Sequence, residues 1–204
     1  MSTNTIITIE RQYGSGGHLI GEKLAESLGI PFYDSELIKV AAKESGICEE
    51  IFESFDEKPT TSFLYSLVMD PYSLGYNSNS FDLPLNHKVF LAAFDTIKEL
   101  ASKGPCVFVG RCADYALSEY KDCFSVFVHA DTDWRINRLS QKHNKTAKEA
   151  KDMINKTDKS RSSYYNYYTN KKWGAASSYN LCVDSSKLGI DGAAKAIIQA
   201  IEYF

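Results

Sequence analysis

A glycine-rich segment directly after a short apolar run constrains the fold of this chain more than any other feature. The run Thr5–Glu10 is rich in β-branched residues, glycines stand at positions 14, 16 and 17, and a helical pattern begins at His18. Glycines between a strand and a helix let successive backbone N–H groups point at one anion, which the helix dipole also attracts. The alternative is a tight turn that needs glycine only for positive φ angles. The order of strand, loop and helix favours a phosphate-binding loop.

The rest of the chain alternates between short apolar runs and longer segments of helical period. This alternation predicts an α/β fold, with a parallel sheet buried on both faces and right-handed connections. A length of 204 residues suits one such domain, 1–204, better than two. The candidate strands are Thr5–Glu10, Pro31–Tyr33, Cys106–Gly110, Phe124–Ala130 and Asn180–Asp184, and the clearest helical patterns are His18–Leu28, Val89–Ala101 and Ile190–Phe204.

Charge and composition narrow the classes of function. The net charge is −3, which makes nucleic acid an unlikely partner and argues against anionic membranes. We recognise neither a signal peptide nor an apolar stretch long enough to cross a bilayer, so we expect a cytoplasmic protein with no membrane association. The five cysteines are scattered and never spaced as CxxC. This pattern predicts reduced, mostly buried thiols rather than disulfides or a metal site.

The glycine loop departs from the Walker A phosphate-binding motif at its charged positions. In that motif a lysine reaches the phosphates and the Ser or Thr after it binds magnesium. Here Gly17 stands at the lysine position, His18 at the hydroxyl position and Arg11 at the position of the first glycine. A dinucleotide-binding GxGxxG pattern also fails, because Leu19 stands at its third glycine. The residues predicted to bind a phosphate or nucleotide are Gly14, Ser15, Gly16, Gly17 and His18.

With that loop, four further segments line up in order, and the whole chain resembles the cytidylate kinase-like family. The segments are ITIERQYGSGGHLIGEKLAESLG at 7–29, PFYDSE at 31–36, VFVGRCAD at 107–114, VFVHADTDWRINRL at 126–139 and the stretch 154–184. The resemblance implies a three-layer P-loop kinase fold with a five-stranded parallel sheet, an acceptor-binding insertion at about 46–87 and a lid at about 155–178. It also implies transfer of a phosphoryl group from ATP, with Mg²⁺, to a nucleoside monophosphate such as CMP or to a related small acceptor.

The same resemblance implies roles for charged residues outside the loop. Asp34 would bind the acceptor, Arg111 would contact the acceptor's phosphate, and Asp158 and Arg161 match the family's Asp-x-x-Arg in the lid. No magnesium ligand is identifiable. Phosphoryl transfer depends on positioning and on spread positive charge. The catalytic candidates that could replace the loop lysine are therefore Arg11, Arg111, Lys156, Lys159 and Arg161.

Structural alternatives stand beside several of these roles. Arg111 could pair with Asp114 in a surface turn, and Asp34 could cap a helix that starts at Ser35. His18 could bind an anion at the helix start or only cap the helix.

Charged residues on the expected helices have the same two interpretations. Lys156, Lys159 and Arg161 could form the solvated face of a helix instead of a phosphate clamp. Arg135 and Arg138 follow two aspartates on a helix, and this spacing predicts an exposed face of ion pairs.

An aromatic cluster and the altered loop leave two further questions open. Tyrosines at 164, 165, 167 and 168 precede Trp173 in the expected lid. They suit either stacking on single-stranded nucleic acid or packing against the core or the second subunit of a homodimer. Because the loop has lost both its lysine and its hydroxyl, the alternative to an enzyme is a non-catalytic nucleotide- or phosphate-binding module derived from a kinase fold.

Overall fold

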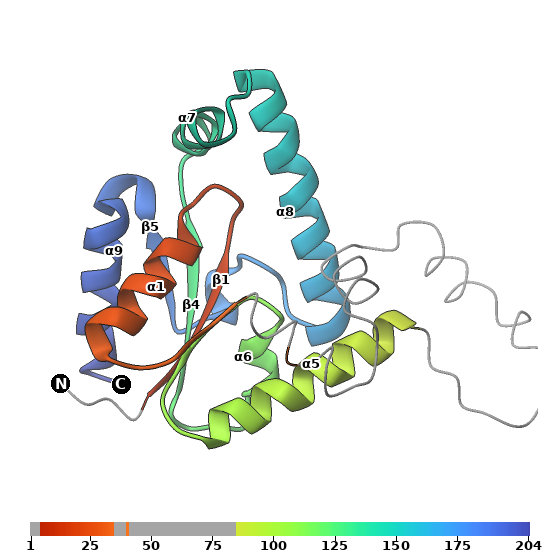
Figure 1. Ribbon diagram of the computed structural model, residues 1–204, viewed down its shortest axis with the longest axis vertical. Helices are drawn as coiled ribbons and strands as arrows, with labels where there is room; N and C mark the ends of the chain where they lie inside the picture. Colours follow the sequence, from red (N-terminus) through yellow and green to blue (C-terminus); the bar gives the residue numbers. More distant parts are fainter. Residues whose placement is uncertain (1–4, 35–39, 41–84) are drawn as a thin grey trace, which may run out of the picture.

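The computed structural model describes residues 5–34, 40 and 85–204, which form a five-stranded sheet between two layers of helices (Figure 1). The strands are β1 (Ile6–Arg11), β2 (Phe32–Tyr33), β3 (Val107–Val109), β4 (Cys123–His129) and β5 (Leu181–Asp184). Their order in the sheet is β2-β3-β1-β4-β5, and every neighbouring pair is parallel. The predicted α/β class with five parallel strands is confirmed.

The central strand of the sheet is β1, which is buried along its whole length. It pairs with β3 on one side, where Ile7 lies opposite Val107, and with β4 on the other, where Ile7 lies opposite Phe124. Helices cover both faces, so consecutive apolar residues are stable here without the alternation of a half-exposed sheet. The chain therefore leaves β1 at the middle of the sheet's carboxyl edge.

Helices from distant parts of the sequence share the two faces of the sheet (Figure 1). One face packs on α1 (Gly17–Leu28) and α9 (Ser185–Ile201), which is interrupted by the non-helical backbone of Gly189. The other face packs on α5 (Leu85–Ser102), the short α6 (Ala113–Ala116) and the C-terminal part of α8 (Ala147–Thr169). The architecture has three layers, as predicted.

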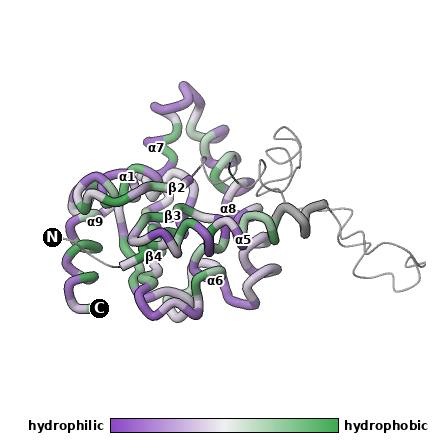
Figure 2. The backbone as a smooth tube through the Cα atoms, turned by 60° about the horizontal axis from the view of Figure 1, so that its bottom comes forward, coloured by the Kyte–Doolittle hydropathy of each residue, from purple (hydrophilic) through white to green (hydrophobic). Residues whose placement is uncertain are grey.

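A pair of helices, α7 (Thr132–His143) and the N-terminal part of α8, extends beyond the carboxyl edge of the sheet (Figure 1). Figure 2 shows that the far end of this pair is mostly hydrophilic. A capping box starts α8, because Thr146 and Glu149 each accept the other's backbone N–H through their side chains. Leu139, Ala150 and Ile154 join the two helices, and Tyr13 packs against them. The helix pair is thereby fixed against the glycine loop.

Two predicted regions are only partly covered by this description. The insertion at about 46–87 lies outside the described residues, apart from 85–87, which open α5. The lid range 155–178 corresponds to the second part of α8, the turn after it and the short 3₁₀ helix η1 (Ala176–Ser178). Within the described ranges, no helix has the length and apolar character needed to span a bilayer.

Candidate functional site

The loop after β1 brings backbone N–H groups to the start of α1. Gly14 and Gly16 have φ angles of 83° and 82°, a left-handed backbone that other residues adopt only at a cost. Gly16 is the N-cap of α1, and no side chain in the described part of the chain provides a capping hydrogen bond there. The first turn also contains no acidic residue. The start of α1 is therefore available to an external anion.

Two buried serines hold the loop in this shape. The hydroxyl of Ser15 donates to the carbonyl of Gln12 at 2.8 Å. The hydroxyl of Ser185, at the start of α9, lies 2.6 Å from the carbonyl of Ser15 and 3.0 Å from that of His129. The side-chain oxygen of Gln12 accepts the backbone N–H of Ala130 at 3.1 Å. The loop is thus tied to the ends of β4 and β5 and needs no ligand to keep its conformation.

A pocket of about 680 Å³ opens in front of the loop. Its walls are the loop itself, the C-terminal part of α7, Arg161 on α8 and Asp34 after β2. Among the described lining residues, Asp34 is the only carboxylate, and the permanently charged cations are Arg11, Arg138, Lys142 and Arg161. Several cations around a backbone anion site suit a ligand that carries several phosphate charges.

The side chain of Arg11 occupies the space that a side chain at position 17 would need. A Cβ atom added to Gly17 would lie 2.5 Å from Cβ of Arg11 and 3.0 Å from its Cγ. Arg11 is 8% exposed, and its Nη1 lies 3.8 Å from a carboxylate oxygen of Glu10. The guanidinium rests on Gly110 at the end of β3, where an added Cβ would overlap Nη1. The stem of Arg11 therefore fills the space beside Gly17, and its charge lies next to Gly110.

Asp158 on α8 binds the loop and α7 at once. Its Oδ1 accepts the backbone N–H of Tyr13 at 2.7 Å, and its Oδ2 accepts from Nη1 of Arg135 at 2.6 Å. Arg161 follows on the same face of α8 and donates to the backbone carbonyl of Arg11 at 3.2 Å. Its guanidinium also lies 5.7 Å from the centre of the Tyr13 ring. Both residues of the Asp-x-x-Arg motif thus contact the backbone of the loop.

The predicted ion-pair face of α7 is wrong for Arg135, which is 6% exposed and bound to Asp158. Asp131, which follows β4, pairs instead with Lys187 of α9 at 2.8 Å, directly after the neighbouring strand β5. Arg135 is buried because it shares a helix face with Leu139, four residues further on, and Leu139 is buried. An arginine on the apolar face of a helix was the signal that the sequence offered.

Arg138 also lies at the site rather than on a solvated face. It lines the pocket, and its Cζ is 3.8 Å from the position of a Cβ atom added to Gly16. The guanidinium lies 5.5 Å from the centre of the Trp134 ring. Ile190 at the start of the straight part of α9 contacts the same glycine. Trp134 and Ile190 therefore flank the pocket wall that carries Arg138, without lining the pocket themselves.

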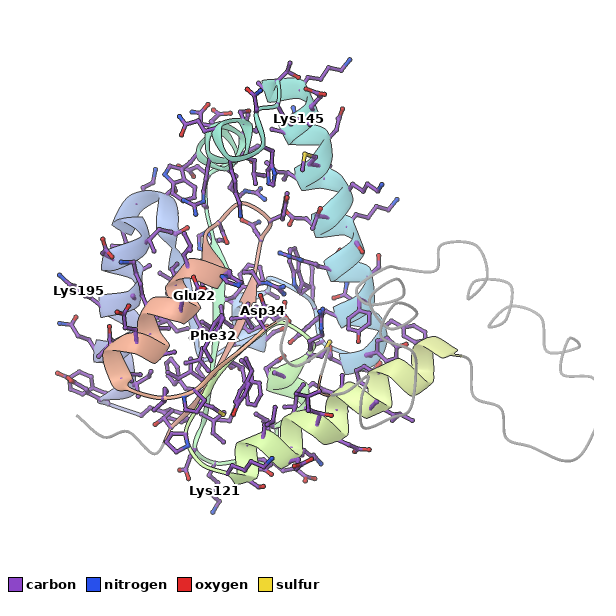
Figure 3. The ribbon with its side chains drawn as sticks, viewed as in Figure 1. Glu22, Phe32, Asp34, Lys121, Lys145 and Lys195 are labelled. Carbon is purple, nitrogen blue, oxygen red and sulfur yellow. The ribbon has the colours of Figure 1, made fainter. Side chains whose placement is uncertain are left out.

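His18 bridges α1 to the residue after β2. Its Nε2 lies 3.0 Å from Asp34 and its Nδ1 lies 3.4 Å from Glu22, and its ring meets Phe32 edge-on (Figure 3). Gly16 is the N-cap, so His18 does not cap α1. The helix expected from Ser35 starts outside the described residues.

The magnesium ion implied by the family resemblance does not fit the described side chains around the loop. Magnesium prefers carboxylate, hydroxyl and water oxygens in octahedral geometry. The hydroxyl position holds His18, which pairs with Asp34, and the hydroxyl of Ser15 is bonded to Gln12. Within the described ranges, no three His, Cys, Asp or Glu side chains gather closely enough to hold a metal.

Three predicted cations lie away from the pocket wall. Lys156 and Lys159 are exposed on α8, where they form a solvated helix face. Arg111 is buried at the end of β3, and both it and Cys112 have left-handed backbones, with φ of 61° and 54°. Such conformations cost on the order of 1–3 kcal/mol each and concentrate at functional sites. The proposed contact between Arg111 and an acceptor phosphate remains a prediction.

The tyrosine cluster belongs mainly to the core. Tyr165 is buried and donates to Asp114 at 2.6 Å, while Lys171 lies 3.4 Å from the same oxygen. Burial raises the pKa of the Asp114 carboxyl, although both partners oppose the shift. Burial and the nearby carboxylate raise the pKa of Tyr165 as well. The Tyr168 ring stacks on Phe90 at 3.9 Å. These contacts favour packing over nucleic-acid stacking.

The cysteines are free thiols at four positions, Cys106, Cys112, Cys123 and Cys182, and Cys48 lies outside the described residues. Burial raises the pKa of Cys106 to about 12 and that of Cys123 to about 11. Thiols with raised pKa values are poor nucleophiles at neutral pH. These two cysteines are structural.

The chain is similar to solved structures along its whole length. An uncharacterized protein from Eubacterium ventriosum shares 29% identity with a TM-score of 0.74, over 98% of this chain and 99% of that one. A shikimate kinase from Bacteroides thetaiotaomicron (15% identity, TM-score 0.55, 97% and 98% covered) and a gluconokinase from Sinorhizobium meliloti (14%, 0.54, 100% and 94%) share the fold. No curated protein sequence matches the chain.

The family is shown by the sequence as a whole. A family model described as the cytidylate kinase-like family matches residues 6–187. That range includes the glycine loop, Asp34, Arg111 and the Asp158–Arg161 motif. The P-loop kinase fold of the sheet and helices agrees with this match. This protein therefore belongs to the cytidylate kinase-like family.

Proposed function

We propose that this protein is a kinase that transfers the γ-phosphoryl group of ATP to a nucleoside monophosphate of the CMP type or to a related small acceptor. The observation that carries this proposal is the cationic pocket at the open start of α1, with its backbone N–H groups and four permanent cations. Membership of a kinase-like family supports it. The pocket volume of about 680 Å³ suits ligands of nucleotide size.

The phosphates of the donor would bind at the loop. Backbone N–H groups of Gly14 and of residues 16–18 supply hydrogen bonds, whereas that of Ser15 already donates to the carbonyl of Gln12 at 3.2 Å. The dipole of α1 adds positive potential. Arg138 and Lys142 on α7 line the same pocket and can neutralise phosphate charge. Arg161 enters from α8, so charges from two helices surround the phosphates. These contacts bind and orient the donor.

The acceptor would approach from the side of β2 and β3. Asp34 follows β2 and lines the pocket, so its carboxylate can accept a hydrogen bond from a hydroxyl or amino group of the acceptor. Arg111 lies two residues after β3, the neighbouring strand, and is buried behind the pocket wall. A guanidinium binds a phosphate with two parallel hydrogen bonds. In this proposal Asp34 orients the acceptor, and Arg111 turns outward to bind its phosphate.

In the proposed reaction an oxygen of the acceptor forms a bond to the γ-phosphorus, the bond to the oxygen bridging the β- and γ-phosphorus breaks, and ADP leaves. Charge spreads over the transferred group, so fixed cations lower the barrier without covalent chemistry. The pair α7–α8 covers the loop and limits access of water, which competes with the acceptor. Magnesium would add charge neutralisation on the nucleotide, and no step here depends on a magnesium site made by the described residues.

A phosphoryl-transfer assay tests the proposal. Purified protein with ATP and Mg²⁺ is offered a panel of nucleoside monophosphates and small hydroxylated metabolites, and both ADP and the phosphorylated product are measured. We expect ADP formation that depends on one acceptor, with about tenfold or greater loss in Arg111→Ala and Arg161→Ala. Lys195→Ala, an exposed change on α9 (Figure 3), is the matched control. Absence of ADP with every acceptor would contradict the proposal.

The second candidate is a non-catalytic module that binds a nucleotide or phosphorylated ligand. Gly17 and His18 at the lysine and hydroxyl positions favour it, as does the poor fit of the described residues to magnesium. Thermal unfolding separates the two functions. Nucleotides that raise the melting temperature without acceptor phosphorylation indicate the module. Melting that is insensitive to every nucleotide contradicts both candidates.

A further inference from the structure

We propose that Arg11 and Gly17 have exchanged the roles that glycine and lysine hold in a Walker A loop, so that Arg11 contacts the transferred phosphate. In the Walker A pattern the first loop position is glycine and the lysine comes near the end of the loop. In this chain Arg11 stands first and Gly17 stands at the lysine position. This inference rests on the proposed kinase function and names the cation that replaces the lysine.

The two positions face each other in space, which is what an exchange requires. A Cβ atom on Gly17 would lie 2.5 Å from Cβ of Arg11, closer than real Cβ contacts allow. The position of a Cβ atom is set by the backbone, so a change of side-chain rotamer cannot relieve this overlap. Only one of the two residues can therefore carry a side chain in this loop. The sequence places the cation on the strand side and the glycine on the helix side.

The path of the Arg11 side chain leads toward the place of transfer. It starts at the end of β1, passes Gly17 and ends against Gly110 at the end of β3. In the sheet β3 lies between β1 and β2, and Asp34 directly follows β2. The guanidinium is thus held between the phosphate loop and the proposed acceptor side. Arg11 still lines the pocket although it is 8% exposed.

The surroundings fix the charge of Arg11 as well as its position. Its backbone carbonyl accepts from Arg161, and its Nη1 lies 3.8 Å from Glu10. The carboxylate of Glu10 also accepts from the indole N–H of Trp173 at 3.2 Å. A guanidinium stays protonated in proteins and presents a rigid fork of donors. Such a group can bind two oxygens of a phosphate at once, whereas lysine acts as a point charge. The packed side chain of Arg11 therefore supplies a cation that is already held in position.

The test reverses the exchange. Gly17→Lys alone should lose turnover by about 100-fold or more, because the new side chain collides with Arg11. Arg11→Met keeps a long stem beside Gly17 but removes the charge, and a similar loss in turnover is expected. Because the buried Glu10 loses its charged neighbour, the melting temperature should fall, so turnover is measured well below it. The double variant Arg11→Gly, Gly17→Lys restores the Walker A arrangement and should recover at least about tenfold over Gly17→Lys. Arg11→Lys should retain part of the activity, because it keeps the charge.

The outcomes are read from turnover and from ATP binding measured separately by calorimetry. Wild-type turnover in Arg11→Met overturns the inference, as does a folded double variant no more active than Gly17→Lys. If the double variant does not fold, Arg11→Met decides the question. If the wild type and Arg11→Met bind ATP and turn it over equally well, only the role of Arg11 is refuted. Wild-type protein that neither binds nor turns over ATP refutes the proposed function itself.

Discussion

The carboxylate of Asp158 holds the guanidinium of Arg135 at 2.6 Å and the backbone N–H of Tyr13 at 2.7 Å. One side chain on α8 therefore joins α7 to the first part of the glycine loop. Arg135 also reaches the carbonyl of Tyr13 at 3.4 Å, so both sides of this residue are bound. This ionic contact adds to the packing of Tyr13 on the helix pair and to the hydrogen bond from Arg161 to the carbonyl of Arg11.

Arg135→Ala should lower the free energy of unfolding by about 3 kcal/mol, because it leaves Asp158 without its charged partner. This is the low end for buried pairs, since the side chain of Asp158 keeps 17% exposure. Urea unfolding measures the change. Asn137→Ala, an exposed position on α7, controls for the loss of a polar side chain. Equal stability of the two variants would show that the pair contributes little.

Ser185→Ala should destabilise the loop more than the protein as a whole. The buried hydroxyl donates to the carbonyl of Ser15, and its loss leaves that carbonyl without the partner, at a cost of about 1–3 kcal/mol. Hydrogen exchange of the backbone N–H groups in 14–18 should become faster, whereas exchange in β3 should change little. Ser118→Ala, at an exposed position, is the control. Unchanged exchange in the loop would contradict the anchoring role of Ser185.

Gly110→Ala should lower turnover by displacing the Arg11 guanidinium. The new Cβ would overlap Nη1, and the backbone φ of 83° adds strain. Gly29→Ala is a closely matched control, because Gly29 has a φ of 66° and no described atom within 4 Å of its added Cβ. Both variants should lose about 1–2 kcal/mol of stability from the left-handed backbone.

The two glycine variants should differ in turnover, which only Gly110→Ala reduces. In the Arg11→Met background the same change should have little further effect on turnover, since the displaced charge is already absent. Independent losses that multiply in the double variant would count against the contact between Arg11 and Gly110.

Asp114→Asn should change how stability depends on pH. Burial raises the pKa of Asp114 in the folded state above its ordinary value of 3.8, so the folded state binds the proton more tightly than the unfolded chain. The contribution of Asp114 is therefore fully present below the ordinary pKa and is lost as pH rises through the raised pKa. The stability of the wild type relative to Asp114→Asn should fall as pH rises from the ordinary pKa of 3.8 through the raised one. Urea unfolding across this range measures it, with exposed Asp95→Asn as the control. A pH-independent difference would refute the assigned cause.

Arg138→Ala should weaken ATP binding and leave the rate of transfer nearly unchanged. Arg138 lies beside Gly16 in the pocket wall formed by α7, and its guanidinium lies 5.5 Å from the centre of the Trp134 ring. Loss of a charge-assisted contact raises KM for ATP by about tenfold. Steady-state kinetics at saturating acceptor gives both constants, and exposed Lys148→Ala on α8 is the control. A fall in kcat with unchanged KM would instead indicate that Arg138 contacts the transferred phosphate.

Local patterns in the sequence were sufficient for the sheet and the loop but not for the contacts that assemble the site. Consecutive apolar residues identified β1, and the glycines marked the loop, because both signals lie within a few residues. The partner of Arg135 lies 23 residues away on another helix. Helix periodicity carries no information about such a distant partner. The charge of Arg135 therefore led to the prediction that its side chain is exposed to solvent. The role of Gly17 required the position of Arg11, which only the folded backbone gives.

The continuous helix α8 runs from an exposed environment at the pocket to a buried one in the core. Arg161 lines the open pocket, and one turn further along the helix Tyr165 is buried against Asp114. A helix without a break transmits displacement along its axis, because packed interiors resist compression. A ligand that contacts Arg161 therefore bears on the same helix that carries the buried hydrogen bond from Tyr165 to Asp114. The indole of Trp173 packs against the cluster that contains Tyr165 and donates to Glu10 on β1, so it lies at the buried end of this helix.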